Sequence, residues 1–161
     1  MDADEQSEPT EAGHTVVERR SDREIVVTRM FDAPVHLVFQ AWSTAELFRQ
    51  WWVPRSMGMT LHECEMDVRT GGSYRLNFGE GMDFFGRYLE VVPSSRIVWT
   101  NEEGVEGGSV TTVTFEERDG RTLLVLSEQY PSAEALEAEG GALDALEETF
   151  GQLEELLASL G

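Results

Sequence analysis

The stretch ALDALEETFGQLEELLASL, residues 142–160, decides the fold of this 161-residue chain. Its apolar side chains recur every three or four residues and form one stripe along an α-helix. They are Leu143, Leu146, Phe150, Leu153, Leu157 and Leu160. The polar side carries five acidic residues, and no basic residue follows Arg121, so ion pairs within the helix do not support it. Packing of the stripe against the rest of the protein must therefore hold this helix in place.

The residues before this helix alternate with a period of two, which indicates β-strands. Six such stretches are separated by turn compositions such as TGG, PSS and RDG. They are residues 59–68, 73–78, 82–92, 96–102, 109–117 and 122–130. Short turns between successive strands predict an antiparallel meander, and a seventh strand at residues 23–31 can pair at its edge. A coiled-coil dimer fits the helix stripe too, but fewer than three heptads favour packing on the sheet.

Two short helices are expected between the first strand and the meander. Asp32 and Pro34 mark the start of the first helix. Ser43 or Thr44 caps the second, and Pro54 ends it. The predicted fold class is therefore α+β, with a curved antiparallel seven-stranded sheet that wraps the long C-terminal helix.

The first twenty residues differ from the rest in composition. They hold six acidic residues, one proline and no aromatic residue, which is too little apolar surface to offset the entropy of ordering them. We therefore predict a flexible acidic tail over residues 1–20 and a single domain over residues 21–161. The chain shows neither a secretory signal nor an apolar run of membrane-spanning length, so a cytoplasmic protein is expected.

The formal net charge of -19 bears on the class of partner. All twelve basic residues are arginines, and a surface this negative repels phosphate groups. Nucleic acids and anionic membranes are therefore not expected as partners. A homodimer through an edge strand or through the acidic helix is an open alternative.

Candidate catalytic and metal-binding residues are few. The spacing of His36, His62 and Cys64 does not match a metal site, and glycine-rich phosphate loops are absent, so we expect neither a metal nor another cofactor. Glu65 and Asp67 alternate on one face of a predicted strand. If that face looked into a cavity, burial would raise their pKa values and suit them to acid or base catalysis. A solvated outer face is the alternative. The weak catalytic candidates are His62, Glu65, Asp67 and Glu128.

Aromatic residues occur in every predicted element and must largely share one interior. A curved sheet closed by one helix often leaves space that its side chains do not fill, and such space suits an apolar ligand. The candidate ligand-binding residues are Phe48, Trp52, Tyr74, Phe78, Phe85, Tyr88, Trp99, Phe115 and Phe150. The alternative is that all of these rings belong to the core.

Several motifs resemble those of bacterial proteins named after the activator of Hsp90 ATPase homologues. They are TRMFDAPVHLVFQAWSTAELFRQWWVP, residues 28–54, CEMDVRTGGSYRLNF, residues 64–78, GRYLEVVPSSRIVWTNEE, residues 86–103, and ETFGQLEELLA, residues 148–158. The resemblance implies the START-like or SRPBCC superfamily with its Bet v 1-like helix-grip fold. It also implies that the tryptophan doublet closes the second short helix at the cavity mouth, with one of Trp51 and Trp52 turned inward and the other supporting the loop before Pro54. Gly71 and Gly72 would form a hairpin turn.

Three functions are compatible with this resemblance, because superfamily members bind lipids, hormones or polyketides, and some are enzymes. We expect a protein that binds a small hydrophobic or amphipathic ligand between the curved sheet and the C-terminal helix, rather than an enzyme. One alternative is an enzyme of the polyketide cyclase/dehydrase or hydrolase type that uses a cavity carboxylate. Another is a stress-related, co-chaperone-like interaction protein, since the eukaryotic namesake stimulates a chaperone ATPase.

Overall fold

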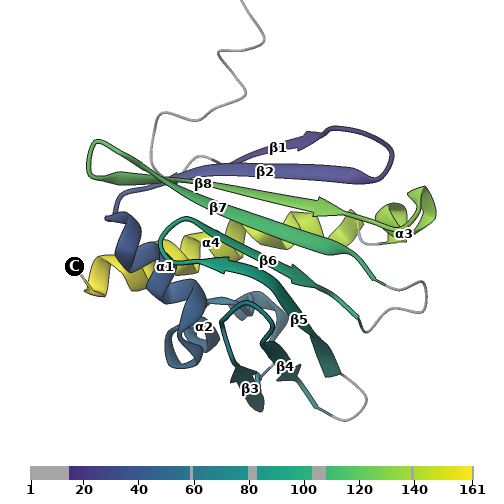
Figure 1. Cartoon of the computed structure of the whole chain (residues 1–161), viewed down its shortest axis with the longest axis horizontal. Coiled ribbons are helices and arrows are strands. Elements are labelled where there is room, and N and C mark those ends of the chain that lie inside the picture. Colours follow the sequence, from purple (N-terminus) through teal and green to yellow (C-terminus); the bar gives the residue numbers. More distant parts are fainter. Residues whose placement is uncertain (1–14, 59, 80–82, 103–107, 139, 161) are drawn as a thin grey trace, which may run out of the picture.

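The computed structural model describes residues 15–58, 60–79, 83–102, 108–138 and 140–160, and it shows a curved antiparallel sheet with helix α4 along one face (Figure 1). The strands are β1 Thr15–Arg19, β2 Glu24–Phe31, β3 Glu63–Met66, β4 Ser73–Asn77, β5 Asp83–Val92, β6 Arg96–Thr100, β7 Val110–Arg118 and β8 Arg121–Gln129. The helices are α1 Val35–Ser43, α2 Ala45–Trp51, α3 Ala133–Ala138 and α4 Gly140–Leu160, with one 3-10 turn at Arg55–Met57. The predicted α+β helix-grip class is confirmed.

The sheet has eight strands in the order β1-β2-β8-β7-β6-β5-β4-β3, one more than predicted. The additional strand, β1, lies within the predicted tail and pairs with β2 from Thr15 opposite Arg29 to Arg19 opposite Ile25. Main-chain hydrogen bonds to the free edge of β2 hold this segment, and they do not require an apolar composition. The sheet therefore begins before the predicted boundary at residue 20. Residues 1–14 of the predicted tail lie outside the described residues.

The two short helices occur as predicted, but their starts are made differently. Pro34 is the residue before the first turn of α1, and Thr44 holds the same place in α2. Neither start has a side-chain capping hydrogen bond, so Asp32 does not cap α1, and of the predicted alternatives Ser43 and Thr44 it is Thr44 that takes the N-cap position of α2. Ser43 instead donates its hydroxyl to the carbonyl of Phe39, 2.9 Å away. The extended backbone of Pro34 and Thr44 is sufficient to begin each helix.

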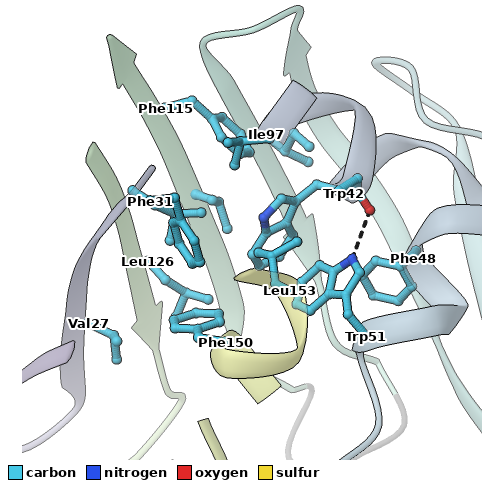
Figure 2. Close-up of a cluster of buried hydrophobic side chains, with 14 of the residues drawn as sticks. Val27, Phe31, Trp42, Phe48, Trp51, Ile97, Phe115, Leu126, Phe150 and Leu153 are labelled. Atoms are coloured by element: carbon cyan, nitrogen blue, oxygen red, sulfur yellow. Dashed lines mark hydrogen bonds between the residues drawn. The ribbon is translucent and has the colours of Figure 1, made fainter. Parts of the chain in front are cut away.

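The core lies between the concave face of the sheet and α4. Phe150, Leu153 and Leu157 of the predicted stripe are buried, and Phe150 meets Phe31 of β2 edge to face with 5.7 Å between ring centroids. Figure 2 shows Phe150 and Leu153 pointing from α4 toward the strands. Leu160 at the end of the stripe is exposed. Burial of these side chains supplies the packing that α4 needs, because its acidic face contributes no internal ion pairs.

A buried arginine adds a polar anchor for α4 that the sequence analysis missed. Arg29 of β2 is 4% exposed and forms ion pairs with Glu154 and Glu147, the latter at 3.6 Å. Its Nη1 atom also donates to the Thr15 hydroxyl of β1, 2.8 Å away. These contacts neutralise acidic residues of α4 at the point where the helix crosses the sheet.

Candidate ligand-binding pocket

A small pocket lies between the two short helices and strands β3 to β6. Its volume is about 60 Å³. The described residues that line it are Trp42, Phe48, Trp52, Met66, Tyr74, Leu76, Phe84, Tyr88, Ile97, Trp99 and Asn101. Seven of these eleven residues are aromatic, and a single one, Asn101, carries a polar group other than a phenol or an indole. The pocket is therefore an apolar space with one polar end.

The position of this pocket corrects the predicted one, which lay between the sheet and the C-terminal helix. Where α4 is described, Phe150, Leu153 and Leu157 are buried in the core against the sheet. Among the described residues, those that line the pocket come instead from α1, the end of α2 and the half of the sheet that ends at β3. Helix α4 packs against the other half of the sheet, where it contacts β2.

The tryptophan doublet is divided between the core and the pocket. Trp51 is fully buried and donates its indole N–H to the carbonyl of Ala41, 3.0 Å away, as Figure 2 shows. Trp52 is half-buried and stacks on Phe48 with 4.8 Å between ring centroids. One ring therefore turns inward, as the resemblance implied, and the other forms part of the pocket wall.

The loop after the doublet is held by Gln152 of α4. The amide nitrogen of this buried side chain donates to the carbonyls of Trp51 and Val53, at 3.0 and 2.9 Å, and its oxygen accepts from the backbone N–H of Arg55 at 2.8 Å. Three bonds from one side chain thus fix the backbone on both sides of Trp52. Sequence reasoning missed Gln152, because a single glutamine beside an apolar stripe carries no signal of its own.

Replacing Gln152 with alanine is expected to lower the free energy of unfolding by about 2 kcal/mol, because buried backbone groups lose their hydrogen-bond partners. Urea unfolding followed by circular dichroism measures the change. The matched control is Gln50→Ala, since the amide of Gln50 is exposed and bonds to Glu46 within its own helix. This control should change stability by less than about 0.5 kcal/mol. Equal effects of the two substitutions would contradict the assigned role of Gln152.

Glu148 fixes the same loop one turn earlier along α4. Its carboxylate accepts hydrogen bonds from the Ser56 hydroxyl at 2.5 Å and from the Ser56 backbone N–H at 2.9 Å. These bonds, with a smaller contribution from the positive charge of Arg55, lower the pKa of Glu148 from its ordinary value of 4.5. The charged form is therefore favoured in the folded protein.

A pH dependence follows from this shift. Because the folded pKa is depressed, the stabilisation by Glu148 is complete above the unfolded value of 4.5 and is lost as the pH falls through the folded value. The thermal midpoint of the wild type should exceed that of Glu148→Gln above pH 4.5, and the gap should close at lower pH. At low pH the protonation of the other carboxylates reduces charge repulsion in both proteins alike, so the difference between their midpoints reports on Glu148. A gap that stays constant over this range would contradict the assignment.

The polar end of the pocket is organised by Asn101, which follows β6. Its side-chain oxygen accepts from the indole N–H of Trp99 at 3.3 Å and lies 3.2 Å from the Tyr74 hydroxyl. Its nitrogen donates to the hydroxyls of Ser109 and Thr111, each 3.0 Å away. Both ends of the amide are therefore used within the protein. Asn101 orients the rings that line the pocket, and the sequence analysis did not select it.

The four weak catalytic candidates do not converge on the pocket. His62, Glu65 and Asp67 are exposed, and the last two line a broad hollow of about 780 Å³ that is open to solvent. Glu128 accepts a hydrogen bond from Ser109 at 2.8 Å, so a hydroxyl and an amide separate it from the pocket. Strand alternation explains why Glu65 and Asp67 are exposed, because Cys64 and Met66, which alternate with them, take the inner positions.

The nine candidate ligand-binding residues fall into three groups. Five line the pocket, namely Phe48, Trp52, Tyr74, Tyr88 and Trp99. Phe115 and Phe150 are buried in the core. Phe78 packs against Phe84 at 5.3 Å between ring centroids, and Phe85 is 42% exposed on the opposite side of β5. Adjacent residues of a strand face opposite ways, so Phe84 rather than Phe85 lines the pocket.

Tyr88 in the pocket wall and Cys64, which contacts the lining residue Met66, are held in their neutral forms. Burial raises the pKa of the Tyr88 phenol, and the negative charge that Cys64 carries as a thiolate and the charge of Asp67 raise it further. Burial also raises the pKa of the Cys64 thiol, against a smaller lowering by the charge of Arg49. Neither group is therefore an activated nucleophile or base at neutral pH.

A family model described as activator of Hsp90 ATPase homolog 1-like protein matches residues 32–158. The chain belongs to this family. The resemblance found in the motifs is thus confirmed. The turn between β3 and β4 contains Gly71 and Gly72, as this resemblance implied. No curated protein matches the chain in sequence. Within the described residues, none of the helices is long and apolar enough to cross a membrane, and none of the His, Cys, Asp and Glu side chains form a group that could hold a metal ion.

Solved structures support the same fold. The chain is similar to a protein from Rhodobacter sphaeroides, with 22% identity, a TM-score of 0.81, and coverage of 92% of this chain and 100% of the other. It is also similar to the protein Ms6760 from Mycobacterium smegmatis, with 23% identity, a TM-score of 0.74, and coverage of 92% and 100%. A protein from Staphylococcus epidermidis gives 26% identity, a TM-score of 0.72, and coverage of 91% and 95%.

Proposed function

We propose that this protein binds a small apolar or amphipathic molecule in the pocket between α1, α2 and strands β3 to β6. The observation that carries the proposal is the aromatic lining, which continues to the surface. Phe84 is 40% exposed while its ring forms part of the pocket wall, and Trp52 beside Phe48 is half-buried. Apolar walls with one polar end are typical of ligand sites, and large exposed apolar side chains at the pocket opening favour an apolar ligand.

The size of the pocket limits what it holds without rearrangement. A volume of about 60 Å³ is well below the roughly 300 Å³ at which pockets for drug-sized ligands begin. The ligand is therefore compact, or it enters by displacing the exposed ring of Phe84 and the half-buried ring of Trp52. Displacing Phe84 breaks its contact with Phe78, and displacing Trp52 breaks its stacking on Phe48.

An enzymatic role has less support. Among the described lining residues, the groups that titrate are the phenols of Tyr74 and Tyr88, and the raised pKa of Tyr88 keeps it protonated. Acid or base catalysis needs a group whose pKa lies near the working pH. The co-chaperone alternative rests on the family description alone, so binding is the function that we propose.

Ligand binding is tested by thermal unfolding with a panel of fatty acids, flavonoids and polyketide-like aromatic compounds. At a hundredfold excess over its Kd, a ligand stabilises the folded state by about 2.7 kcal/mol, which corresponds to a rise of roughly 5 to 10 °C in the thermal midpoint. Phe84→Ala should weaken this response. The matched control is Phe85→Ala, because Phe85 is equally exposed but faces away from the pocket. If no compound raises the midpoint, or if both variants respond alike, the proposal fails.

A further inference from the structure

The hydroxyl of Tyr88 is a polar group in the pocket wall that the protein itself leaves without a partner. Tyr88 is 5% exposed and belongs to the lining. Its hydroxyl makes no hydrogen bond within the described residues, whereas the hydroxyl of Tyr74 in the same wall donates to the carbonyl of Thr100, 2.8 Å away. A buried hydroxyl without a partner costs free energy in the folded protein, so a bound acceptor would recover it.

The Tyr88 hydroxyl faces accessible space. Among the described residues, the side-chain nitrogen and oxygen atoms that are completely enclosed and lack a partner are Nε of Arg29 and Nε1 of Trp42. The Tyr88 oxygen lacks a partner but is not one of these atoms, so part of its surface is accessible. The pKa of Tyr88 responds to Cys64 and Asp67, which lie in and directly after β3. Because β3 contributes to the pocket wall, the hydroxyl faces the pocket on this side.

The surroundings of this hydroxyl favour an uncharged partner. Burial and the negative charge of Asp67 raise the pKa of the Tyr88 phenol, so the phenol stays protonated and donates a hydrogen bond. The same two effects disfavour an anion beside it. The described lining contains neither a basic nor an acidic side chain, so an ion of either sign would lose hydration without gaining a charged partner. The charge of Arg49 affects the pKa of Cys64 but not that of Tyr88.

The volume of the pocket restricts the buried part of the ligand to a small group. About 60 Å³ is roughly twice the ~30 Å³ that one water molecule occupies in the liquid, so the group has only a few non-hydrogen atoms. The remainder of a longer amphipathic ligand would lie against the exposed ring of Phe84 and the half-buried ring of Trp52.

We infer that the ligand of this pocket inserts a compact, uncharged group whose oxygen, such as that of a carbonyl, accepts a hydrogen bond from the hydroxyl of Tyr88. The inference rests on the proposed function and specifies the chemistry of the same site. A carbonyl suits an apolar pocket, because it brings an acceptor without a donor that would need a partner of its own. Tyr88 is therefore a specificity-determining residue.

Four small probes of the same branched shape, each with four non-hydrogen atoms, separate these properties. Acetone carries a carbonyl oxygen, 2-chloropropane has a chlorine in its place, acetate is an anion, and isopropylammonium is a cation. Dissociation constants are measured by chemical-shift titration of the wild-type protein at neutral pH. Acetate and isopropylammonium should each bind at least about tenfold more weakly than acetone, because neither ion finds a charged partner in the pocket.

Two tyrosine variants test the part played by the hydroxyl. Tyr88→Phe removes the hydroxyl and keeps the ring, so it should weaken the binding of acetone relative to 2-chloropropane about fivefold, the typical effect of one hydrogen bond. The matched control is Tyr74→Phe, which removes a hydroxyl that already donates to Thr100 in the same wall. The ratio of the two affinities should persist in this control. The ratio is the readout because both probes experience the same change in the pocket.

Thermal unfolding without a ligand gives a readout that does not depend on binding. Tyr88→Phe should leave the thermal midpoint unchanged or raise it, because its hydroxyl has no partner to lose. Tyr74→Phe should lower the midpoint, because the Thr100 carbonyl loses its donor. An equal loss in both variants, or a Tyr88→Phe variant that does not fold, would show that the Tyr88 hydroxyl is bonded within the protein and would overturn the inference.

The outcomes distinguish this inference from the proposed function. If Tyr88→Phe leaves the affinity ratio unchanged, or if either ion binds the wild type as tightly as acetone, the inference is wrong while ligand binding stands. If none of the four probes binds but a compound of the larger panel raises the thermal midpoint, the inference again fails alone. If neither the probes nor the panel compounds bind, the proposed function fails with it.

Discussion

Replacing Trp51 with alanine is expected to lower the free energy of unfolding by about 4 kcal/mol. The side chain is fully buried, and its ring contacts Trp42, Phe48 and Trp52 at centroid distances between 4.8 and 5.5 Å. The substitution removes these contacts, leaves a cavity between α1 and α2, and deprives the Ala41 carbonyl of its indole donor. Urea unfolding followed by far-UV circular dichroism measures the loss.

The adjacent residue is the matched control. Trp52→Ala should cost about 1 kcal/mol, because this half-buried ring packs on one side and faces the pocket and solvent on the other. Ligand-induced stabilisation should show the reverse order, since Trp52 lines the pocket. If the two alanine variants unfold at the same urea concentration, the division of the doublet between core and pocket is wrong.

Gly86→Ala is expected to lower the free energy of unfolding by about 3 kcal/mol. A methyl group at this position in β5 would lie 1.9 Å from the carbonyl oxygen of Thr100 and 2.9 Å from the ring of Tyr74. The first contact is with backbone, which cannot rotate away, and the Tyr74 hydroxyl itself donates to the same carbonyl at 2.8 Å. The substitution therefore separates β5 from β6 beside the polar end of the pocket.

Gly151→Ala supplies the control for this effect. Gly151 lies within α4, and no atom would come within 4 Å of an added methyl group. Alanine is a better helix former than glycine, so this variant should gain about 0.5 to 1 kcal/mol in the free energy of unfolding. Opposite signs for the two glycine substitutions are the expected result. A neutral Gly86→Ala variant would show that β5 and β6 are not in this close contact.

Periodicity predicted the fold because α4 and strands such as β5 and β7 have one buried and one more exposed face, although β2 is buried on both faces. The stripe of α4 and the alternation of β4 to β8 were sufficient to place a helix on a curved antiparallel sheet. β1 was missed because an edge strand is held by main-chain hydrogen bonds to β2, which leave little trace in side-chain composition. The buried anchor Arg29 was missed for a related reason, since its acidic partners lie more than a hundred residues away in α4.

The site was harder to predict than the fold. Aromatic composition indicated a cavity but not its position, because packing at the ångström scale decides which rings leave space between them. Phe150, a candidate pocket residue, is buried in the core, and Phe84 rather than its neighbour Phe85 faces the pocket. Asn101 and Gln152 act through hydrogen bonds to distant segments, and a single sequence does not reveal such partners.

The most direct test of the account is a titration of the four tryptophan indole N–H resonances, assigned through single Trp→Phe variants, with the panel compound that raises the thermal midpoint most. Trp42, Trp52 and Trp99 line the pocket, whereas Trp51 is buried with its N–H bonded to Ala41 and serves as an internal control. We predict that the first three resonances shift with one shared Kd, while that of Trp51 changes far less. Resonances that do not move, or that move without saturation, would contradict a ligand site in this pocket.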